Sequence, residues 1–404
     1  MIYRIFRTLW LGPCFLIVAC SGGGGGTDPV LGPNEVAVII DSGPTGSSIN
    51  MPFTTVTVCA PGGSSCRTID HVLVDTGSAG LRIVGSKIDS SVLPAESDAN
   101  GDPVMECTQF ADGDAWGSIK LADVRIANEE ASAVPIQVIG DPNAPAVPDN
   151  CSQAGNGLNS VAAFGSNGVL GVEGFDQDCG PTCALSPSSG SYTPFYYGCP
   201  TSTSCASIAQ PLDQQVQNPV GHFTTDNNGI MLELSPILGI GAPSLGGKLV
   251  FGIGTQSNNA VGNPHILAID PATSRTATTY GGLQKISYVD SGSNALFFVD
   301  SSIPACGDND VASGFYCPNT KTLKSASVEL DDGSQTIINF TVDNADNLLF
   351  SDPRFTVFST LAGPGFLPAD RFVWGLPFFI GKTVIFALPD KFTPLGTGPL
   401  IAYQ

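Results

Sequence analysis

The sequence predicts an all-β protein made of two pseudo-symmetric β-rich lobes. Glycine (48 residues) and proline (31 residues) are abundant, charged residues make up only 13% of the 404-residue chain, and long stretches of helical periodicity are hard to find. This composition is typical of many short strands joined by tight turns. The chain is also too long for one ordinary core, so two domain-sized units are expected. A short Asp-centred motif, VDTGS and then VDSGS, occurs once in each half.

Residues 1–19 have the pattern of an export signal. Arg4 and Arg7 precede a short apolar run, as in signal peptides, and the run is too short for a comfortable membrane span. Leu16–Cys20 resembles a bacterial lipobox, which makes Cys20 the expected lipidated residue, with an ordinary signal peptide as the alternative. Residues 20–34 contain five consecutive glycines and are predicted to form a flexible tether. We therefore expect an exported protein that is lipid-anchored in the cell envelope, at the periplasmic face or the outer membrane, or otherwise secreted.

The cysteines point to an oxidising compartment. Ten remain after Cys14 and Cys20 are set aside, and an even number in an exported chain favours disulfides. Proximity suggests four pairs and leaves two cysteines for each other, although spacing alone does not determine connectivity. The candidate pairs are Cys59 and Cys66, Cys179 and Cys183, Cys199 and Cys205, Cys306 and Cys317, and Cys107 and Cys151. Zinc binding by the cysteines from Cys179 to Cys205 is the weaker alternative, because no histidine accompanies them.

Short alternating or β-branched runs bounded by Gly and Pro predict the strands. In the first half these runs are EVAVIID, FTTVTVCA, HVLVDTG, a hairpin over Met105–Ile126, GIMLELS and GGKLVFG. In the second half they are KISYVDSGSNALFFVD, SASVELDDG, TIINFTVDN and VWGLPFFIGKTVIFALP. The lobes are thus expected at residues 35–254 and 255–404. Residues 140–211 form a loop-like insert stapled by cysteines, and Gln210–Pro219 is one of the few helix candidates.

Asp75 and Asp290 each end an apolar, strand-like run. One such Asp before Thr-Gly or Ser-Gly would be an ordinary turn signal, but a carboxylate at the end of a buried strand must be hydrogen-bonded or paired. Two carboxyl groups about 3 Å apart share one proton. One group then accepts a proton from water while the other donates to a carbonyl oxygen. This pattern predicts hydrolysis of an amide without a covalent intermediate.

Six neighbouring residues are expected to support this pair. Gly77 and Gly292 permit tight turns that bring backbone N–H groups to the carboxylates. The hydroxyl groups of Thr76 and Ser291 are placed to brace one turn against the other. Ser78 and Ser293 are placed to donate to the outer carboxylate oxygens.

The two motifs resemble those of the pepsin-like aspartic peptidases, which carry one Asp-Thr/Ser-Gly in each lobe. Four further segments match in the same order: the flap hairpin at Phe110, Gly113 and Gly117, the crossing strand at Val169, Leu170 and Gly171, the closing strand Gly246–Gly252, and the partner strand at Val373, Trp374 and Gly375. The resemblance implies a bacterial exported member with a peptide cleft between its lobes. It also implies catalytic Asp75 and Asp290, a flap with Phe110 and Gly113, an extended polypeptide substrate, a monomer, and no cofactor or metal.

Three positions depart from the family pattern. Phe110 replaces the flap tyrosine, Arg82 replaces the tryptophan that this tyrosine contacts, and Leu376 replaces an Asp that often follows the second partner glycine. Loss of the flap hydroxyl is expected to weaken catalysis without abolishing the dyad. Two functions remain: an aspartic endopeptidase, or a catalytically weak or inactive pepsin-fold protein that acts as a cell-surface binding or scaffold protein. The intact DTGS and DSGS motifs favour the peptidase.

Other classes find no support in the sequence. The net charge of −20 leaves no basic patch for nucleic acid, and membrane contact is expected only through the lipid anchor. His71, His222 and His265 show no metal-ligand spacing. The Glu96–Asp102 segment has its glycine misplaced for a calcium loop and predicts a surface turn. Serine-hydrolase elbows and phosphate-binding loops are missing from the sequence.

Overall fold

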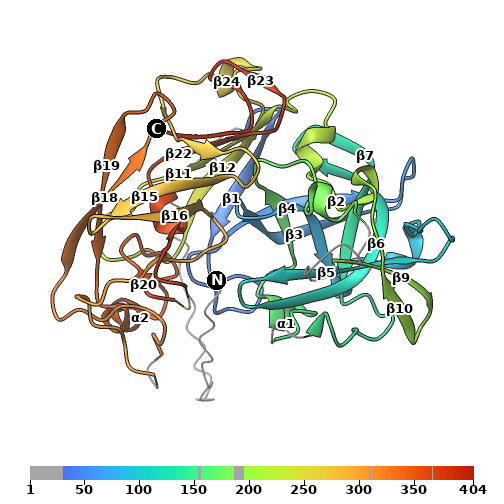
Figure 1. Cartoon of the computed structure of the whole chain (residues 1–404), viewed down its shortest axis with the longest axis horizontal. Helices are drawn as coiled ribbons and strands as arrows, with labels where there is room; N and C mark the ends of the chain where they lie inside the picture. Colours follow the sequence, from blue (N-terminus) through green and yellow to red (C-terminus); the bar gives the residue numbers. More distant parts are fainter. Residues whose placement is uncertain (1–30, 153–155, 186–194, 309–310, 366) are drawn as a thin grey trace, which may run out of the picture.

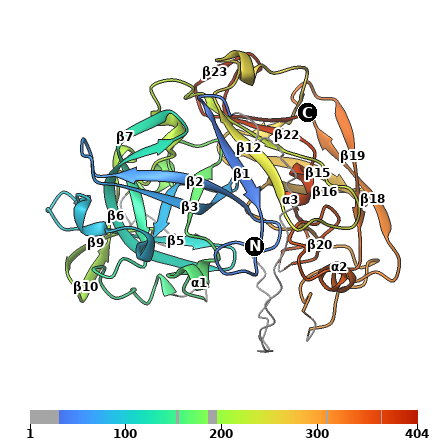
Figure 2. The same cartoon turned by 180° about the vertical axis from the view of Figure 1, so that it is seen from behind.

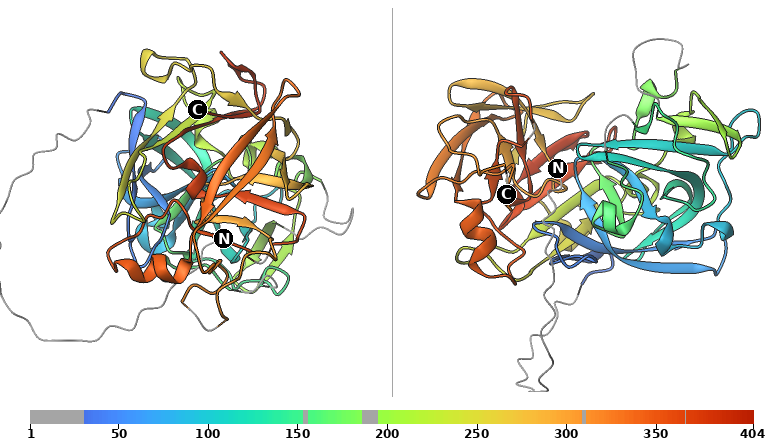
Figure 3. Two further views of the ribbon diagram at one scale, coloured as in Figure 1. Left: turned by 90° about the vertical axis from the view of Figure 1, so that its left-hand side faces the viewer. Right: turned by 90° about the horizontal axis from the view of Figure 1, so that it is seen from below.

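The computed structural model describes residues 31–152, 156–185, 195–308, 311–365 and 367–404. Figure 1 shows strands coloured blue to green in one half and strands coloured orange to red in the other. The view from below in Figure 3 shows the same two halves side by side. Within the described residues, no helix is both long and apolar enough to cross a membrane.

Strands dominate both halves. From the amino end to residue 254 the strands are β1 (Glu35–Ile40), β2 (Pro52–Cys59), β3 (Cys66–Asp75), β4 (Ala79–Val84), β5 (Val104–Phe110), β6 (Gly113–Ile126), β7 (Glu129–Ile139), β8 (Gly168–Val172), β9 (Tyr196–Thr201), β10 (Ser204–Ser207), β11 (Gly229–Leu234) and β12 (Leu245–Phe251). From residue 255 onward they are β13 (His265–Ile266), β14 (Ile269–Asp270), β15 (Arg275–Tyr280), β16 (Leu283–Val289), β17 (Leu296–Phe298), β18 (Thr322–Glu329), β19 (Gln335–Val342), β20 (Ala362–Gly363), β21 (Arg371–Trp374), β22 (Thr383–Ala387), β23 (Phe392–Thr393), β24 (Gly396–Thr397) and β25 (Leu400–Tyr403). The α-helices of the described residues are short: α1 (Val161–Phe164), α2 (Ala345–Ser351) and α3 (Leu376–Phe379).

The two halves repeat one local arrangement, which confirms the expected fold. In the first half, β8 pairs in parallel with β3 and antiparallel with β4, so it lies between the strand that ends at Asp75 and the strand that follows it. In the second half, β21 pairs in parallel with β16 and antiparallel with β17, on either side of Asp290. The protein is therefore an all-β molecule with two pseudo-symmetric lobes.

A shared sheet joins the lobes. Among the described residues, β1, β12, β11, β22, β25 and β13 are consecutive neighbours in the larger sheet. Strands from both sides of the expected lobe boundary at 254–255 therefore belong to this sheet. Figure 2 shows β1 and β12 side by side between the two halves. Because both lobes contribute backbone hydrogen bonds to this sheet, it holds them in a fixed relation around the two Asp motifs.

The core of each lobe consists of alternating strand residues. Leu81, Leu170 and Val172 are buried in the first lobe, at most 1% exposed. In the second lobe, aromatic side chains pack in one cluster, in which the rings of Phe298 and Phe372 stack with centroids 5.0 Å apart. Trp374 lies against this cluster and donates from its ring nitrogen to Thr278 Oγ1 at 2.9 Å. This packing supports the strands that carry both Asp motifs.

Five disulfides join the same pairs that proximity in the sequence suggests. They are Cys59–Cys66, Cys107–Cys151, Cys179–Cys183, Cys199–Cys205 and Cys306–Cys317. The alternative zinc site in Cys179–Cys205 is excluded, because these cysteines have no thiolate to offer while they are paired.

Two expectations about residues 140–219 are wrong. The region expected to be a loop adds a hairpin, β9–β10, to the edge of the larger sheet, where β9 pairs with β5. The helix expected at Gln210–Pro219 is reduced to one 3-10 turn over Leu212–Gln214. Its glutamines bond nearby backbone carbonyls; Gln217 Nε2, for instance, donates to Leu212 O at 2.7 Å. Such side-chain bonds compete with helix formation.

Candidate active site

Asp75 and Asp290 occupy equivalent places at the carboxyl ends of β3 and β16. Gly77 N donates to Asp75 Oδ1 at 2.9 Å, and Ser78 Oγ donates to Asp75 Oδ2 at 2.6 Å. In the second lobe, Gly292 N donates to Asp290 Oδ1 at 2.8 Å, and Ser293 Oγ donates to Asp290 Oδ2 at 2.7 Å. Each carboxyl group thus has the same pair of donors, which fixes its orientation.

The two Asp turns brace each other across the lobes. Ser291 N donates to Thr76 Oγ1 at 2.9 Å, and Thr76 N donates to Ser291 Oγ at 3.1 Å. Each hydroxyl group then donates to a backbone carbonyl of the other lobe, Thr76 to Val289 at 3.1 Å and Ser291 to Val74 at 2.7 Å. Both residues are buried, at 1% and 0% exposure. Thr76 and Ser291 therefore lie where the sequence places them, and lock the turns together.

Glycines allow the two carboxyl groups to meet. A Cβ atom on Gly77 would lie 2.7 Å from Asp290 Oδ1, and one on Gly292 would lie 2.6 Å from Asp75 Oδ1. The partner strands repeat this constraint, since a Cβ on Gly171 would lie 2.7 Å from Ser78 O. On Gly375 it would lie 2.6 Å from Ser293 O, the equivalent atom of the other lobe. Any larger residue would push the Asp turns apart.

The pair holds a proton well above the usual range for carboxyl groups. Burial, followed by the charge of Asp290 and its hydrogen-bonding contact, raises the pKa of Asp75 to about 7 against the opposing donors Ser78 and Gly77. Asp75 is only 7% exposed. A carboxyl pair of this kind titrates as a unit, so we assign the shared proton to the dyad rather than to one residue.

A pocket of about 270 Å³ opens over the dyad. The hairpin of β5 and β6 covers one side of it, and Phe110 at its tip pairs in register with Gly113. The Phe110 ring makes an edge contact with Phe164, with centroids 5.4 Å apart. The structure thus forms the expected flap hairpin over the pair, with an apolar ring at its tip.

Arg82 lies at the centre of a buried polar network behind this pocket. It is 1% exposed, and its Nη2 contacts Glu106 Oε1 at 2.8 Å and Asp178 Oδ2 at 2.7 Å. Its Nε donates to Thr108 Oγ1 at 3.0 Å, and its Nη1 donates to Ala79 O at 2.8 Å. Arg82 therefore ties the flap strand β5 to the first Asp turn and to the insert.

The acidic partners of Arg82 are themselves a close pair. Burial raises the pKa of Asp178 well above its ordinary value, and the charge of Glu106 adds to this, with Arg82 opposing. Tyr196 also donates to Asp178 Oδ1 at 2.7 Å. The two carboxyl groups are in hydrogen-bonding contact, and Glu106 Oε2 has no hydrogen-bond partner among the described residues. One cation, Arg82, thus holds two closely spaced acids.

Glu173 is a third carboxyl group beside the dyad that the sequence motifs did not indicate. It follows β8 and lines the same pocket as Asp75 and Asp290. Burial, together with the charges of Asp75 and Asp290, raises its pKa to about 8. The sequence signal was available, since Glu173 lies two residues after the glycine that crosses the first Asp loop, but only the pairing of β8 with β3 and β4 brings it to the dyad.

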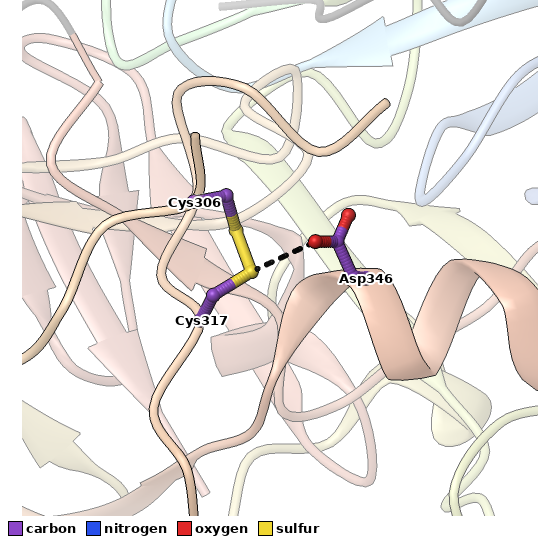
Figure 4. A group of neighbouring side chains, drawn as sticks. All are labelled: Cys306, Cys317 and Asp346. Atoms are coloured by element: carbon purple, nitrogen blue, oxygen red, sulfur yellow. Dashed lines mark hydrogen bonds between the residues drawn. A yellow bond between two sulfur atoms is a disulfide. The ribbon is translucent and has the colours of Figure 1, made fainter. Parts of the chain in front are cut away.

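Metal chemistry finds no ready site in the described residues. One group there has three side chains of ligand type, namely Cys306, Cys317 and Asp346. Figure 4 shows that the two cysteines form a disulfide and that Asp346 Oδ2 points to Cys317 Sγ, 3.5 Å away. A disulfide sulfur carries neither a proton nor a thiolate charge, so this is a contact and not a ligand set.

The structure also places most of the other residues that the sequence analysis singled out. Glu96–Asp102 is a turn in which Asp98 Oδ1 accepts from the backbone of Asn100 and Asp102. His71 contacts Asp41 and Asp70 on the surface side of β3, and does not line the pocket over the dyad. Leu376 is buried, and its N–H donates to Ser293 O at 2.7 Å. Cys20, the expected lipidation site, lies outside the described residues.

Comparison with known proteins gives a family and a distant structural likeness. The crystal structure of an aspartic proteinase from Irpex lacteus matches with 16% identity and a TM-score of 0.49, over 91% of this chain and 96% of that one. No curated protein matches the sequence. A family model described as "Protein of unknown function (DUF3443)" matches residues 31–403. The chain belongs to this family, the proteins of unknown function DUF3443.

Proposed function

We propose that this protein is an aspartic endopeptidase in which Asp75 and Asp290 activate water to hydrolyse peptide bonds. One observation carries the proposal: Thr76 and Ser291 lock two equivalent Asp turns together, so that the two carboxyl groups are in hydrogen-bonding contact at the base of a pocket. Structural turns would not need a buried acid, Asp75, brought into contact with the half-buried Asp290 of the other lobe, because pairing like charges is unfavourable without a role for the proton.

The reaction follows from this arrangement. The ionised member of the dyad accepts a proton from water as its oxygen bonds to the carbonyl carbon of the substrate, and the protonated member donates to the carbonyl oxygen. The C–N bond then breaks as a proton from the dyad moves to the leaving nitrogen. As the C=O bond re-forms, a hydroxyl group of the tetrahedral intermediate returns its proton to the other carboxylate. The dyad thus regains its single proton, and the reaction needs neither a cofactor nor a covalent enzyme intermediate. Donors on the outer oxygens, Ser78 and Ser293, keep the inner oxygens directed toward the reacting groups.

Substitution of each acid tests the proposal. Asp75→Asn and Asp290→Asn preserve shape but remove one carboxyl group, and each should abolish cleavage of unfolded casein across pH 3–7. The matched control is Asp370→Asn, which changes an acid that is exposed on the second lobe and paired with Arg371. A statine-type transition-state mimic should compete with casein for the wild-type protein. Cleavage that persists in either dyad variant would overturn the proposal.

The second candidate is a catalytically weak or inactive pepsin-fold protein that acts as a cell-surface binding or scaffold protein. Phe110 favours it, because the flap tip presents no hydroxyl group and packs against Phe164 instead. Arg82, the second departure from the family pattern, donates hydrogen bonds to Glu106, Asp178 and the Ala79 carbonyl instead of contacting a flap tyrosine. Absence of any casein cleavage by the wild-type protein across pH 3–7, with the statine mimic still bound, would favour this candidate.

We also propose that the protein is exported and lipid-anchored through Cys20, and acts as a monomer on extended polypeptides. Five disulfides support export, since such bonds persist in oxidising compartments. Metabolic labelling with a radioactive fatty acid should mark the wild-type protein in a bacterial host. The Cys20→Ser variant should lose the label and leave the membrane fraction, whereas equal labelling of both would contradict the anchor.

A further inference from the structure

Glu173 is held beside the dyad by its own backbone. Its N–H donates to Ser78 O at 2.9 Å, and its carbonyl accepts from Asn218 Nδ2 at 3.2 Å. Ser78 in turn donates to Asp75. The position of the Glu173 side chain is therefore coupled to the Asp turn, and its carboxyl group lies at the wall of the dyad pocket.

The pocket carries a surplus of acidic side chains. Five carboxyl side chains line it: Asp75, Asp112, Glu173, Asp178 and Asp290. Its single lining cation is Arg82, which is already engaged by Asp178 and Glu106. Within the described residues Glu173 forms neither an ion pair nor a side-chain hydrogen bond, and the nearby Arg275 lies over the Tyr288 ring, 5.4 Å from its centroid. Glu173 thus faces the pocket as an acid without a basic partner.

A basic side chain of the substrate can supply the partner that Glu173 lacks. A half-buried carboxylate beside two other acids is costly to ionise, which is why the pKa of Glu173 is raised, and an approaching cation removes the cost. The pocket also offers apolar rings, Phe110 and Phe164, for an aliphatic stem. A side chain with an apolar stem and a cationic tip matches both features. A compact metal ion would match only the charge.

We propose that Glu173 makes the cleft selective for polypeptides that carry lysine or arginine beside the scissile bond. This inference rests on the proposed peptidase function and names its substrate class. Glu173 would act as a specificity residue that pairs with the basic side chain while the dyad performs the hydrolysis.

Cleavage-site mapping provides the first test. Unfolded casein would be digested by the wild-type protein, by Glu173→Gln and by a control, Glu130→Gln, which removes an exposed acid paired with Arg125 away from the pocket. Mass spectrometry of the products should show wild-type and control sites enriched in lysine or arginine next to the cut. The enrichment should disappear in Glu173→Gln. A digest with Asp75→Asn measures cleavage by contaminating proteases, and should yield no cleavage sites.

Matched peptides make the test quantitative. One cleaved site would be synthesised with either lysine or norleucine beside the bond, and the ratio of kcat/KM values measured. The wild-type protein and Glu130→Gln should favour lysine about tenfold, as expected for one charge-assisted hydrogen bond, and Glu173→Gln should bring the ratio near one. Wild-type cleavage with equal rates for both peptides would overturn the specificity proposal and leave the peptidase proposal standing.

A binding measurement keeps the inference testable if the protein does not cleave. Statine-containing versions of the two peptides would be titrated calorimetrically into the wild-type protein and Glu173→Gln. A lysine preference of about tenfold that is lost in Glu173→Gln supports the inference. Equal affinity, or no binding of either mimic, overturns it. It is also overturned if calcium or magnesium alone raises the melting temperature of the wild-type protein but not of Glu173→Gln, because Glu173 would then serve a metal ion.

Discussion

Thr76 and Ser291 exchange hydrogen bonds across the two lobes: the N–H of each residue donates to the hydroxyl oxygen of the other, at 3.1 and 2.9 Å. Each hydroxyl group also donates to a carbonyl of the opposite lobe. All four bonds are buried, so none can be replaced by water without opening the site. The relationship makes the separation of the two Asp turns a property of the whole fold.

Removal of one hydroxyl group should therefore affect stability and activity together. Thr76→Val keeps the shape but leaves Ser291 N–H and Val289 O without partners, and should lower the free energy of unfolding by about 1–3 kcal/mol. Thr76→Ser retains the hydroxyl group and serves as the control. Urea unfolding and casein cleavage would be measured for both. If Thr76→Val matches Thr76→Ser in stability, the exchange does not brace the lobes.

Activity should depend on pH through the shared proton. The dyad needs one proton, and burial together with the charge of Asp290 raises the pKa of Asp75 to about 7. Because the raised pKa belongs to an acid, the proton is retained below that pH and lost as the pH rises through it. Cleavage should therefore fall steeply above pH 7, with a loss of about tenfold per unit. A pH profile of kcat/KM checks this, and undiminished activity at pH 9 would contradict it.

The network around Arg82 should behave as a unit. Arg82→Met leaves Glu106 and Asp178 buried without a cation, and should destabilise the protein by about 3–5 kcal/mol. Arg82→Lys should also be destabilising, because lysine lacks the planar fork that bonds several partners. The triple variant Arg82→Met, Glu106→Gln, Asp178→Asn removes the unpaired charges and should recover most of the loss. Urea unfolding of the three variants tests the coupling, which fails if the triple variant is no more stable than Arg82→Met.

The parts of the site that could be predicted are those whose residues lie in short sequence motifs. Asp75 and Asp290 sit in near-identical pentapeptides, so their pairing, the bracing of Thr76 with Ser291 and the donors Ser78 and Ser293 could all be read from the sequence. The closeness of most cysteine partners made the disulfides predictable as well. Apart from Cys107 and Cys151, which are paired as the two cysteines left over, the residues that must meet either lie close in the chain or belong to a repeated motif.

Other features depend on contacts that no local pattern records. The sequence shows Arg82 only as a replacement of the tryptophan that the flap tyrosine contacts, and its partners Glu106 and Asp178 lie 24 and 96 residues away. Glu173 joins the dyad only because β8 crosses the first Asp turn. The helix expected at Gln210–Pro219 failed because its glutamine side chains bond the backbone instead. Polar side chains whose partners lie far away in the sequence are thus the part of this site that could be identified only from the structure.

The disulfides should contribute different amounts to the free energy of unfolding, according to the lengths of the loops they close. Cys107–Cys151 joins the flap strand to the insert across 44 residues, whereas Cys179–Cys183 spans only 4. The loop-entropy model gives about 4 kcal/mol for the longer loop and about 2 kcal/mol for the shorter one. Replacement of each pair by alanine, followed by urea unfolding, should give losses in that order. Equal losses would show that loop entropy does not dominate.

Glu173 should make the folded protein less stable as the pH rises. Burial and the charges of Asp75 and Asp290 raise its pKa to about 8 in the folded state, against the weaker attraction of Arg275. The sign follows from linkage: below its unfolded pKa near 4.5 the group is protonated in both states and costs nothing, and between that pH and about 8 the unfolded chain ionises more readily.

Glu173→Gln mimics the protonated acid and isolates this effect. At pH 4 its free energy of unfolding should match that of the wild-type protein, and at pH 9 it should exceed it by on the order of 2 kcal/mol, because the wild-type protein must then ionise a half-buried acid. Urea unfolding at both pH values measures the difference, with Glu130→Gln as the exposed control that should show none. A Glu173→Gln variant that is no more stable than the wild-type protein at pH 9 would mean that Glu173 ionises freely, with a partner or solvent already satisfying its charge.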